Sequence, residues 1–143
     1  MRRYIVAMVM VIGMSNVSAV HAGAEIVLVV NKSNPVNTLT KARVRSMILG
    51  AVKKWPTGDA VSVITTSPGD AERKSALLTY AGMSEQQFAT AFLQANFKGE
   101  DRTPPKTLPN GKIIVQIVAL TPGAIGFVDS ADLSPMVKRV AVE

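Results

Sequence analysis

The sequence predicts an α/β fold in which a mixed, mostly parallel sheet is flanked by helices. Short apolar runs rich in β-branched residues alternate along the chain with stretches whose apolar residues recur at helical spacing. Glycine, proline and asparagine separate these segments at nearly every boundary. Alternation of this kind is typical of a sheet that is covered by helices on both faces.

The first predicted strand is the continuous apolar run of residues 25–30, which leads into a turn-forming Asn-Lys-Ser-Asn-Pro sequence. A run without polar alternation is typical of a strand buried on both faces. A helix over residues 40–49 follows, because threonines at 38 and 40 can cap it and Gly50 stops its helical spacing.

The next connection contains Trp55, which we expect to pack inward, and it leads to a second strand over residues 60–65. Either Asp70 or Ser67 can cap the helix that follows, and Gly82 ends it. The expected inward stripe of this helix is Ala71, Lys74, Leu77, Leu78 and Ala81.

Another helix is predicted after Ser84, because Ser84 and Gln87 have the spacing of a capping box. Its expected buried face is Phe88, Ala91, Phe92 and Ala95. The polar, proline-rich residues 97–111 are interpreted as a surface loop. Residues 112–120 fit a strand or a helix equally well, and two further strands are predicted over residues 124–128 and 137–142.

The N-terminus has the pattern of a secretory signal peptide. Arg2 and Arg3 precede an uncharged run, and small residues follow it. Cleavage after Ala22 is favoured, and the run is too short for the alternative of a membrane-spanning anchor. We therefore predict a cleaved signal peptide at residues 1–22, a single domain at residues 23–143 and a periplasmic location.

Composition excludes several functional classes. The 143 residues carry a formal charge of +6, but the basic residues are scattered and aromatic residues are few, which disfavours nucleic-acid binding. The chain has no cysteine, and His21 belongs to the predicted signal peptide. No catalytic residue, metal site or cofactor is therefore predicted, and the chain is not expected to be an enzyme.

Noncovalent recognition remains, and one segment has the chemistry for it. Between the second strand and its helix lies a hydroxyl-rich, glycine-containing turn. The start of a helix exposes backbone N–H groups and the positive end of the helix dipole, which suits an anion. Serine, threonine and aspartate at this position are also common as simple helix caps. The candidate ligand-binding residues are Thr65, Thr66, Ser67, Gly69, Asp70 and Arg73.

The order of motifs resembles that of the phosphate-binding proteins of ABC transporters, within the type 2 periplasmic binding protein superfamily. The matching segments are the strand at 26–30, Ile-Leu-Gly-Ala-Val-Lys-Lys-Trp at 48–55, the strand, turn and helix at 61–74, and Thr-Pro-Gly-Ala-Ile-Gly-Phe-Val at 121–128. The resemblance implies a periplasmic-binding-protein-like lobe, and it implies that residues 111–120 are helical.

The resemblance also implies two departures. Proteins of this family are about twice as long and hold phosphate between two lobes, whereas this chain corresponds to the second lobe with its hinge strands. The Gly-Ser-Gly-Thr turn of the family falls on residues 69–72, where Asp70 and Glu72 stand in place of hydroxyls. The family's arginine before the turn falls on Thr66, so that Arg73 or Lys74 would have to supply the positive charge.

Two hypotheses follow for function. The first is a noncatalytic, periplasmic substrate-binding-protein-like domain related to the anion-binding components of ABC transporters, with inorganic phosphate or another small anion as its ligand. The alternative is a ligand-free interaction or scaffold module of the cell envelope that retains the lobe fold. The expected partners are an ABC permease, another envelope protein or a second copy in a homodimer, and neither nucleic acid nor a membrane anchor is expected.

Overall fold

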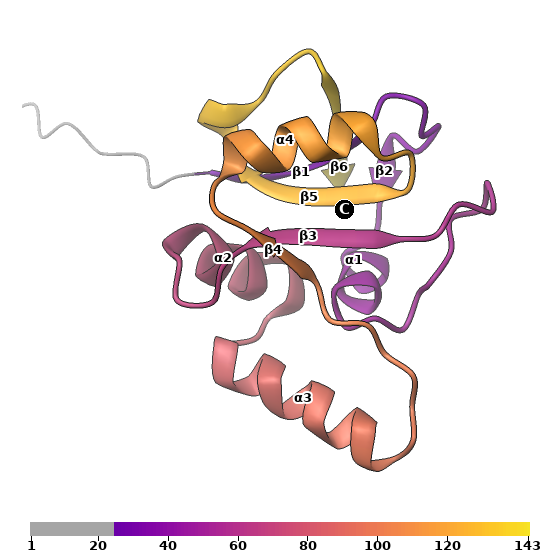
Figure 1. Cartoon of the computed structure of the whole chain (residues 1–143), viewed down its shortest axis with the longest axis vertical. Coiled ribbons are helices and arrows are strands. Elements are labelled where there is room, and N and C mark those ends of the chain that lie inside the picture. Colours follow the sequence, from indigo (N-terminus) through magenta and orange to yellow (C-terminus); the bar gives the residue numbers. More distant parts are fainter. Residues whose placement is uncertain (1–24) are drawn as a thin grey trace, which may run out of the picture.

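A computed structural model describes residues 25–143, and the predicted signal peptide lies outside the described residues. One six-stranded sheet runs through the molecule in the order β2-β6-β1-β5-β3-β4 (Figure 1). The strands are β1 (Ile26–Asn31), β2 (Thr38–Leu39), β3 (Ser62–Thr66), β4 (Lys106–Leu108), β5 (Ala124–Asp129) and β6 (Val137–Val142).

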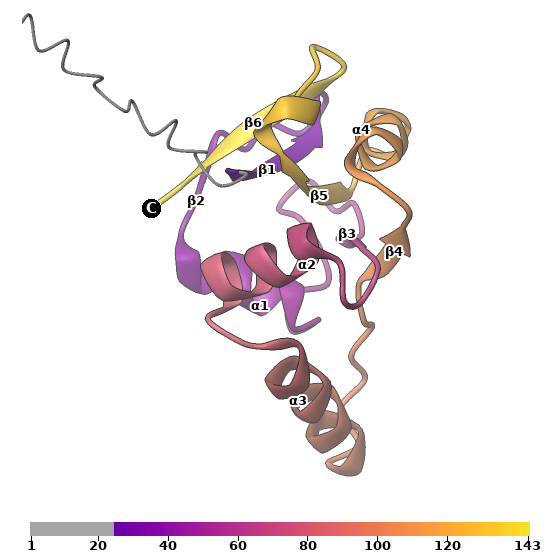
Figure 2. The same ribbon diagram turned by 90° about the vertical axis from the view of Figure 1, so that its left-hand side faces the viewer.

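Helices cover both faces of this sheet. They are α1 (Lys41–Ile48), α2 (Ala71–Ala76), α3 (Glu85–Phe97) and α4 (Gly111–Leu120), with a π-helical turn η1 (Leu77–Ala81) and a short 3₁₀ helix η2 (Ser130–Asp132). Figures 1 and 2 show α4 on one face and α1 and α2 on the other, while α3 lies farther out, beyond α1 and α2. No helix in residues 25–143 is long and apolar enough to cross a membrane.

The sheet is mixed and mostly parallel, as the sequence predicts. β5, β3 and β4 run parallel to one another, β2 runs parallel to β6, and β1 is antiparallel to both of its neighbours. We call the edge where β3, β4 and β5 end the carboxyl edge, and the opposite edge, where β3 and β5 begin, the amino edge. Both α2 and α4 begin at the carboxyl edge, but they lie on opposite faces of the sheet (Figure 2).

The core consists of two apolar clusters, one on each face. Alternate residues of β1 supply both: Leu28 and Val30 pack with Met47 and Phe127 on the α1 side. The cluster on the α4 side contains Val27, Val29, Ile64, Ile114, Val115 and Val118. Because both faces are buried, β1 is apolar along its whole length, which explains its continuous run in the sequence.

Most predicted helix boundaries are confirmed. Thr40, Asp70 and Ser84 each accept a hydrogen bond from a backbone N–H of the helix that follows, and Ser84 and Gln87 form the predicted capping box. Residues 111–120 are helical, as the family resemblance implies. Trp55 is buried, and its Nε1 donates to the Gly123 carbonyl oxygen at 2.9 Å.

Two expectations are wrong. Residues 97–111 are not only a loop, because they contain the end of α3 and the edge strand β4. The sequence also did not predict the short strand β2. The inward face of α2 and η1 also differs, because Ala71, Lys74 and Leu78 are exposed whereas Arg73 and Ala76 are buried. The π-helical turn η1 widens the helix after Ala76, which shifts the helical spacing away from a regular period.

Candidate functional site

The turn between β3 and α2 lies at the carboxyl edge, and a helix cap already organises it. The Asp70 backbone N–H donates to the Ser67 carbonyl oxygen at 3.0 Å, and Gly69 has a φ of +86°, which favours glycine. The Asp70 carboxylate accepts from the Glu72 backbone N–H at 2.8 Å. Of the two predicted caps, Asp70 is therefore the one used, and its side chain occupies the start of α2.

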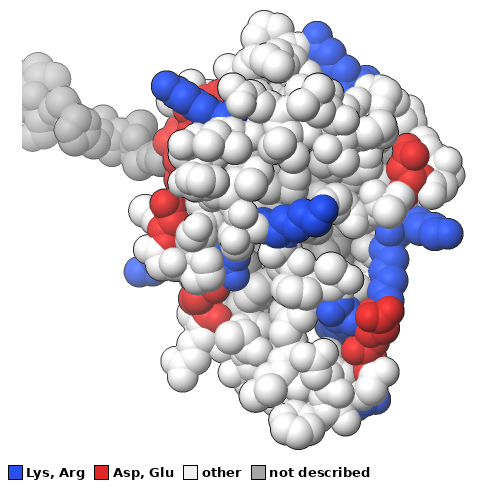
Figure 3. Space-filling model, viewed as in Figure 1, with Lys and Arg blue, Asp and Glu red and all other residues white. Residues whose placement is uncertain are grey.

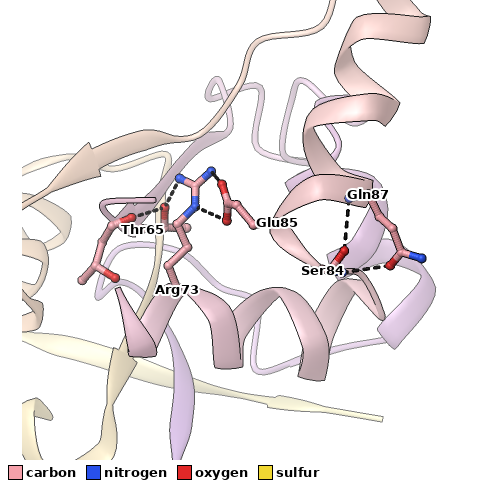
Figure 4. A network of polar contacts seen from close by, with 6 residues as sticks. Thr65, Arg73, Ser84, Glu85 and Gln87 are labelled. Atoms are coloured by element: carbon pink, nitrogen blue, oxygen red, sulfur yellow. Dashed lines mark hydrogen bonds and ion pairs between the residues drawn. The ribbon is translucent and has the colours of Figure 1, made fainter. Parts of the chain in front are cut away.

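Arg73 is buried, and its guanidinium group forms hydrogen bonds with two other side chains (Figure 4). Its Nε and Nη2 donate to the two carboxylate oxygens of Glu85 at 2.9 and 2.7 Å, and its Nη1 donates to Thr65 Oγ1 at 3.1 Å. The guanidinium carbon also lies 5.4 Å from the centre of the Phe88 ring. Arg73, which was predicted to supply the positive charge for an anion, therefore connects β3 and α2 to the first turn of α3.

The two threonines of the predicted site lie on different sides of β3. Thr65 lies on the α2 side with Arg73, and its hydroxyl also donates to the Thr66 carbonyl oxygen at 3.0 Å. Thr66 is one residue later, so its side chain points to the α4 face, as strand alternation requires. Thr66 Oγ1 is buried, and no group in residues 25–143 forms a hydrogen bond with it.

The remaining predicted residues lie at the surface. Ser67 and Gly69 are exposed in the turn, and Asp70 is partly buried at the cap. The structure thus brings Thr65 and Arg73 into one hydrogen-bonded group and separates Thr66 from it. Of the six predicted residues, only Ser67 and Gly69 are exposed to solvent at the turn.

Four carboxylates gather beside this turn, and the sequence reasoning did not identify the group. Burial, followed by repulsion from Asp132, Asp70 and Asp129, raises the pKa of Glu72 above its ordinary value of 4.5. Glu72 Oε2 is buried without a hydrogen-bond partner in the described chain, at the first residue of α4. A Cβ on Gly111 would lie 3.4 Å from this oxygen and would collide with the Asp132 carboxylate.

These acids come from two segments, Asp70 and Glu72 at the start of α2 and Asp129 and Asp132 at the start and end of η2, so no single local motif contains all four. Asp70 and Asp129 each stand directly before a helix and cap it, and that capping pattern is the only sequence signal for the group. Together the carboxylates make the carboxyl edge locally negative, which opposes binding of a phosphate dianion. These four carboxylates are not arranged to hold a metal ion, and no other group of three or more histidine, cysteine or acidic side chains in residues 25–143 is.

Comparisons with known proteins place this geometry in context. No family model matches the chain, and no curated protein matches it. Solved structures with similar folds include the three described here. A phosphate transport receptor from Vibrio cholerae has 18% identity and a TM-score of 0.57, and covers 83% of this chain and 46% of that protein.

The other two structures are a phosphate ABC transporter substrate-binding protein with bound phosphate from Clostridium perfringens and the PstS protein of Borrelia burgdorferi. Their identities are 20% and 11%, and each has a TM-score of 0.64. They cover 83% and 84% of this chain, and 45% and 47% of their own chains. This chain therefore spans less than half the length of the proteins it matches, and its described residues have the fold of part of a phosphate ABC transporter substrate-binding protein.

Proposed function

We propose that this chain is a noncatalytic, periplasmic binding domain of the substrate-binding-protein type, and that a small anion such as phosphate is its ligand. The observation that carries this proposal is the start of two helices, α2 and α4, on opposite faces at the carboxyl edge. In open α/β sheets, ligands bind outside the carboxyl ends of strands where the connections diverge to opposite faces. One of the similar structures is a phosphate transport receptor and another contains bound phosphate, which supports the choice of ligand class.

The proposed site consists of the predicted residues Thr65, Thr66, Ser67, Gly69, Asp70 and Arg73. In this site, the exposed turn at Ser67 and Gly69 meets the anion first. Arg73 lies behind the turn and must exchange its contact with Glu85 for one with the ligand. Exchanging partners costs free energy, and the nearby carboxylates oppose an anion, so the expected affinity is low, on the order of a millimolar dissociation constant.

Calorimetric titration of residues 23–143 with phosphate and with sulfate tests this proposal. We expect saturable binding of phosphate that an Arg73→Gln variant loses. The matched control is Lys74→Gln, which removes the same charge from the adjacent, exposed position. A wild-type protein that gives no heat and no thermal shift at about 10 mM anion would contradict the proposal.

A second candidate function is a ligand-free interaction module of the cell envelope. The observation that favours it is the hydrogen-bonded group of Arg73, Glu85 and Thr65, because an arginine that is held by side chains of the same chain is a structural element. Here the carboxyl edge contacts an ABC permease or another envelope protein, or a second copy of the chain.

The Glu85→Gln variant separates the two candidates, because it weakens the hold of Glu85 on Arg73 without removing the arginine. Phosphate affinity that rises in this variant supports the first function. If neither wild type nor the variant binds an anion, the interaction module is favoured. Crosslinking in cells from a photoreactive residue at position 67, compared with one at position 32, then tests whether the carboxyl edge contacts another protein. Sedimentation measures whether the chain forms a homodimer.

A further inference from the structure

A cavity of about 460 Å³ opens at the amino edge of the sheet, far from the turn described above. One wall is the connection between α1 and β3, and the other is the segment that leads into β4. In Figure 1 the start of β3 is its right-hand end, next to α1. Its volume is within the range of about 300–1,000 Å³ that is usual for small-molecule sites.

Specific contacts fix both walls. The Lys54 and Ala60 backbones form an antiparallel bridge, and the Val61 N–H donates to the Lys53 carbonyl oxygen at 2.9 Å. Gly50 has a φ of +72°, and a Cβ there would lie 2.9 Å from the Thr103 carbonyl oxygen, so the two walls are in direct contact. The cavity is therefore already formed in the folded protein.

The interior of the cavity is mainly apolar and its rim is basic. Apolar side chains include Met47, Val52, Val61 and Val63, and the rim carries Lys53, Lys54 and Lys106. Figure 3 shows lysine and arginine atoms across the middle and along the right-hand side of this face, with acidic atoms also on that side.

The three lysines differ in their partners. Lys53 forms an exposed ion pair with Asp101 at 3.2 Å. Lys54 and Lys106 form no ion pair with any carboxylate of residues 25–143. Asp59 lies on the same connection, but its carboxylate accepts from Thr57 Oγ1. Two ammonium groups therefore remain available at the mouth of an apolar cavity.

We propose that this cavity binds a small monocarboxylic acid with an apolar body, such as hexanoate. The carboxylate lies at the rim between Lys54 and Lys106, and the hydrocarbon chain lies against the valine and methionine side chains. Charge-assisted hydrogen bonds then fix the orientation, and burial of the hydrocarbon supplies most of the affinity. An inorganic anion lacks the apolar part, so it leaves the interior of the cavity unfilled.

Titration with hexanoate, followed by NMR of the methyl groups of Met47, Val61 and Val63, tests the proposal. We expect saturable shifts at these methyl groups below about 10 mM ligand. Hexanol has the same chain without the charge, and we expect it to bind roughly tenfold more weakly or worse. A Lys54→Gln/Lys106→Gln double variant should lose affinity for hexanoate to the same degree, while its affinity for hexanol stays unchanged.

Two control variants complete the design. Lys32→Gln/Lys112→Gln removes two exposed lysines that do not line the cavity, so it should bind hexanoate like the wild type. Neither Arg73 nor the turn before α2 lines this cavity, so failure of the phosphate proposal leaves this one testable. Equal affinity for hexanoate and hexanol, unchanged affinity in the Lys54/Lys106 variant, or no saturable shift would each overturn the inference.

Discussion

The two edges of the sheet use basic side chains in opposite ways. At the carboxyl edge, Arg73 is only 6% exposed and donates to Glu85 and Thr65, so it holds elements together. At the amino edge, Lys54 and Lys106 are exposed and have no acidic partner in the described chain. The comparison teaches that burial and partners decide whether a cation is structural or available to a ligand. A sequence motif shows that a basic residue lies near the end of a strand, but it does not show whether that residue is buried or has an acidic partner.

The largest expected effect comes from removing the structural cation. Arg73→Met should lower the free energy of unfolding by about 2–3 kcal/mol, because it leaves Glu85 and Thr65 without their partner. The loss is below that of a fully buried pair, since the Glu85 side chain is 37% exposed and can be hydrated. Urea denaturation measures it.

Lys74→Met is the matched control, because Lys74 is the exposed neighbour of Arg73 and has no ion pair in the described chain. Its expected change is below about 0.5 kcal/mol. If the two variants lose similar amounts of unfolding free energy, Arg73 does not have a structural role and the two edges do not differ in this respect.

A smaller effect is expected at the amino edge, where Trp55 anchors one wall of the cavity. Trp55→Phe removes the hydrogen bond to Gly123 and should cost about 1–2 kcal/mol in urea denaturation. It should also weaken hexanoate binding, because the connection that carries Lys54 loses its anchor. Phe97→Leu, at a position that is 84% exposed, should change neither quantity. Unchanged ligand binding in Trp55→Phe would show that the wall does not depend on this anchor.

The smallest effect concerns protons at the carboxyl edge. Because burial and neighbouring carboxylates raise the pKa of Glu72, the folded protein holds this proton more tightly than the unfolded chain does. The stabilisation from protonating Glu72 is therefore complete below the ordinary value of 4.5, and it is lost as pH rises through the raised pKa.

Glu72→Gln removes this contribution. The stability advantage of this variant over wild type should be largest near neutral pH, and it should shrink as the pH falls toward the ordinary pKa of 4.5. Thermal melts of both proteins across this interval measure the difference. An advantage that stays constant with pH would contradict a raised pKa of Glu72, and with it the effects of burial and of the neighbouring carboxylates.

Much of the fold could be predicted because its signals are local. The continuous apolar run of β1, the Ser84 capping box and the glycine and proline stops each depend on neighbouring residues. The edge strands were missed because they are short and half exposed: β4 has three residues and lacks an apolar pattern. β4 is a strand because it pairs with β3, and this long-range pairing cannot be inferred from the local sequence of residues 106–108.

The site was less predictable because its contacts are long-range. The turn and its capping residue follow from local spacing, but the partner of Arg73 is twelve residues away on another helix. The carboxylates near Glu72 belong to two segments that are far apart in the sequence, and their proximity depends on where η2 meets α4. The amino-edge cavity likewise requires residues from α1, β3 and β4 at once.

The position of β1 at the centre of the sheet has a consequence for the order of folding. β1 lies at the start of the described chain, whereas its two neighbours, β5 and β6, lie at the end. The central ladders therefore cannot form during synthesis until almost all of these residues have left the ribosome, and such high contact order slows folding. Until then, residues 26–31 have no partner strand on either side, and the sheet lacks its centre.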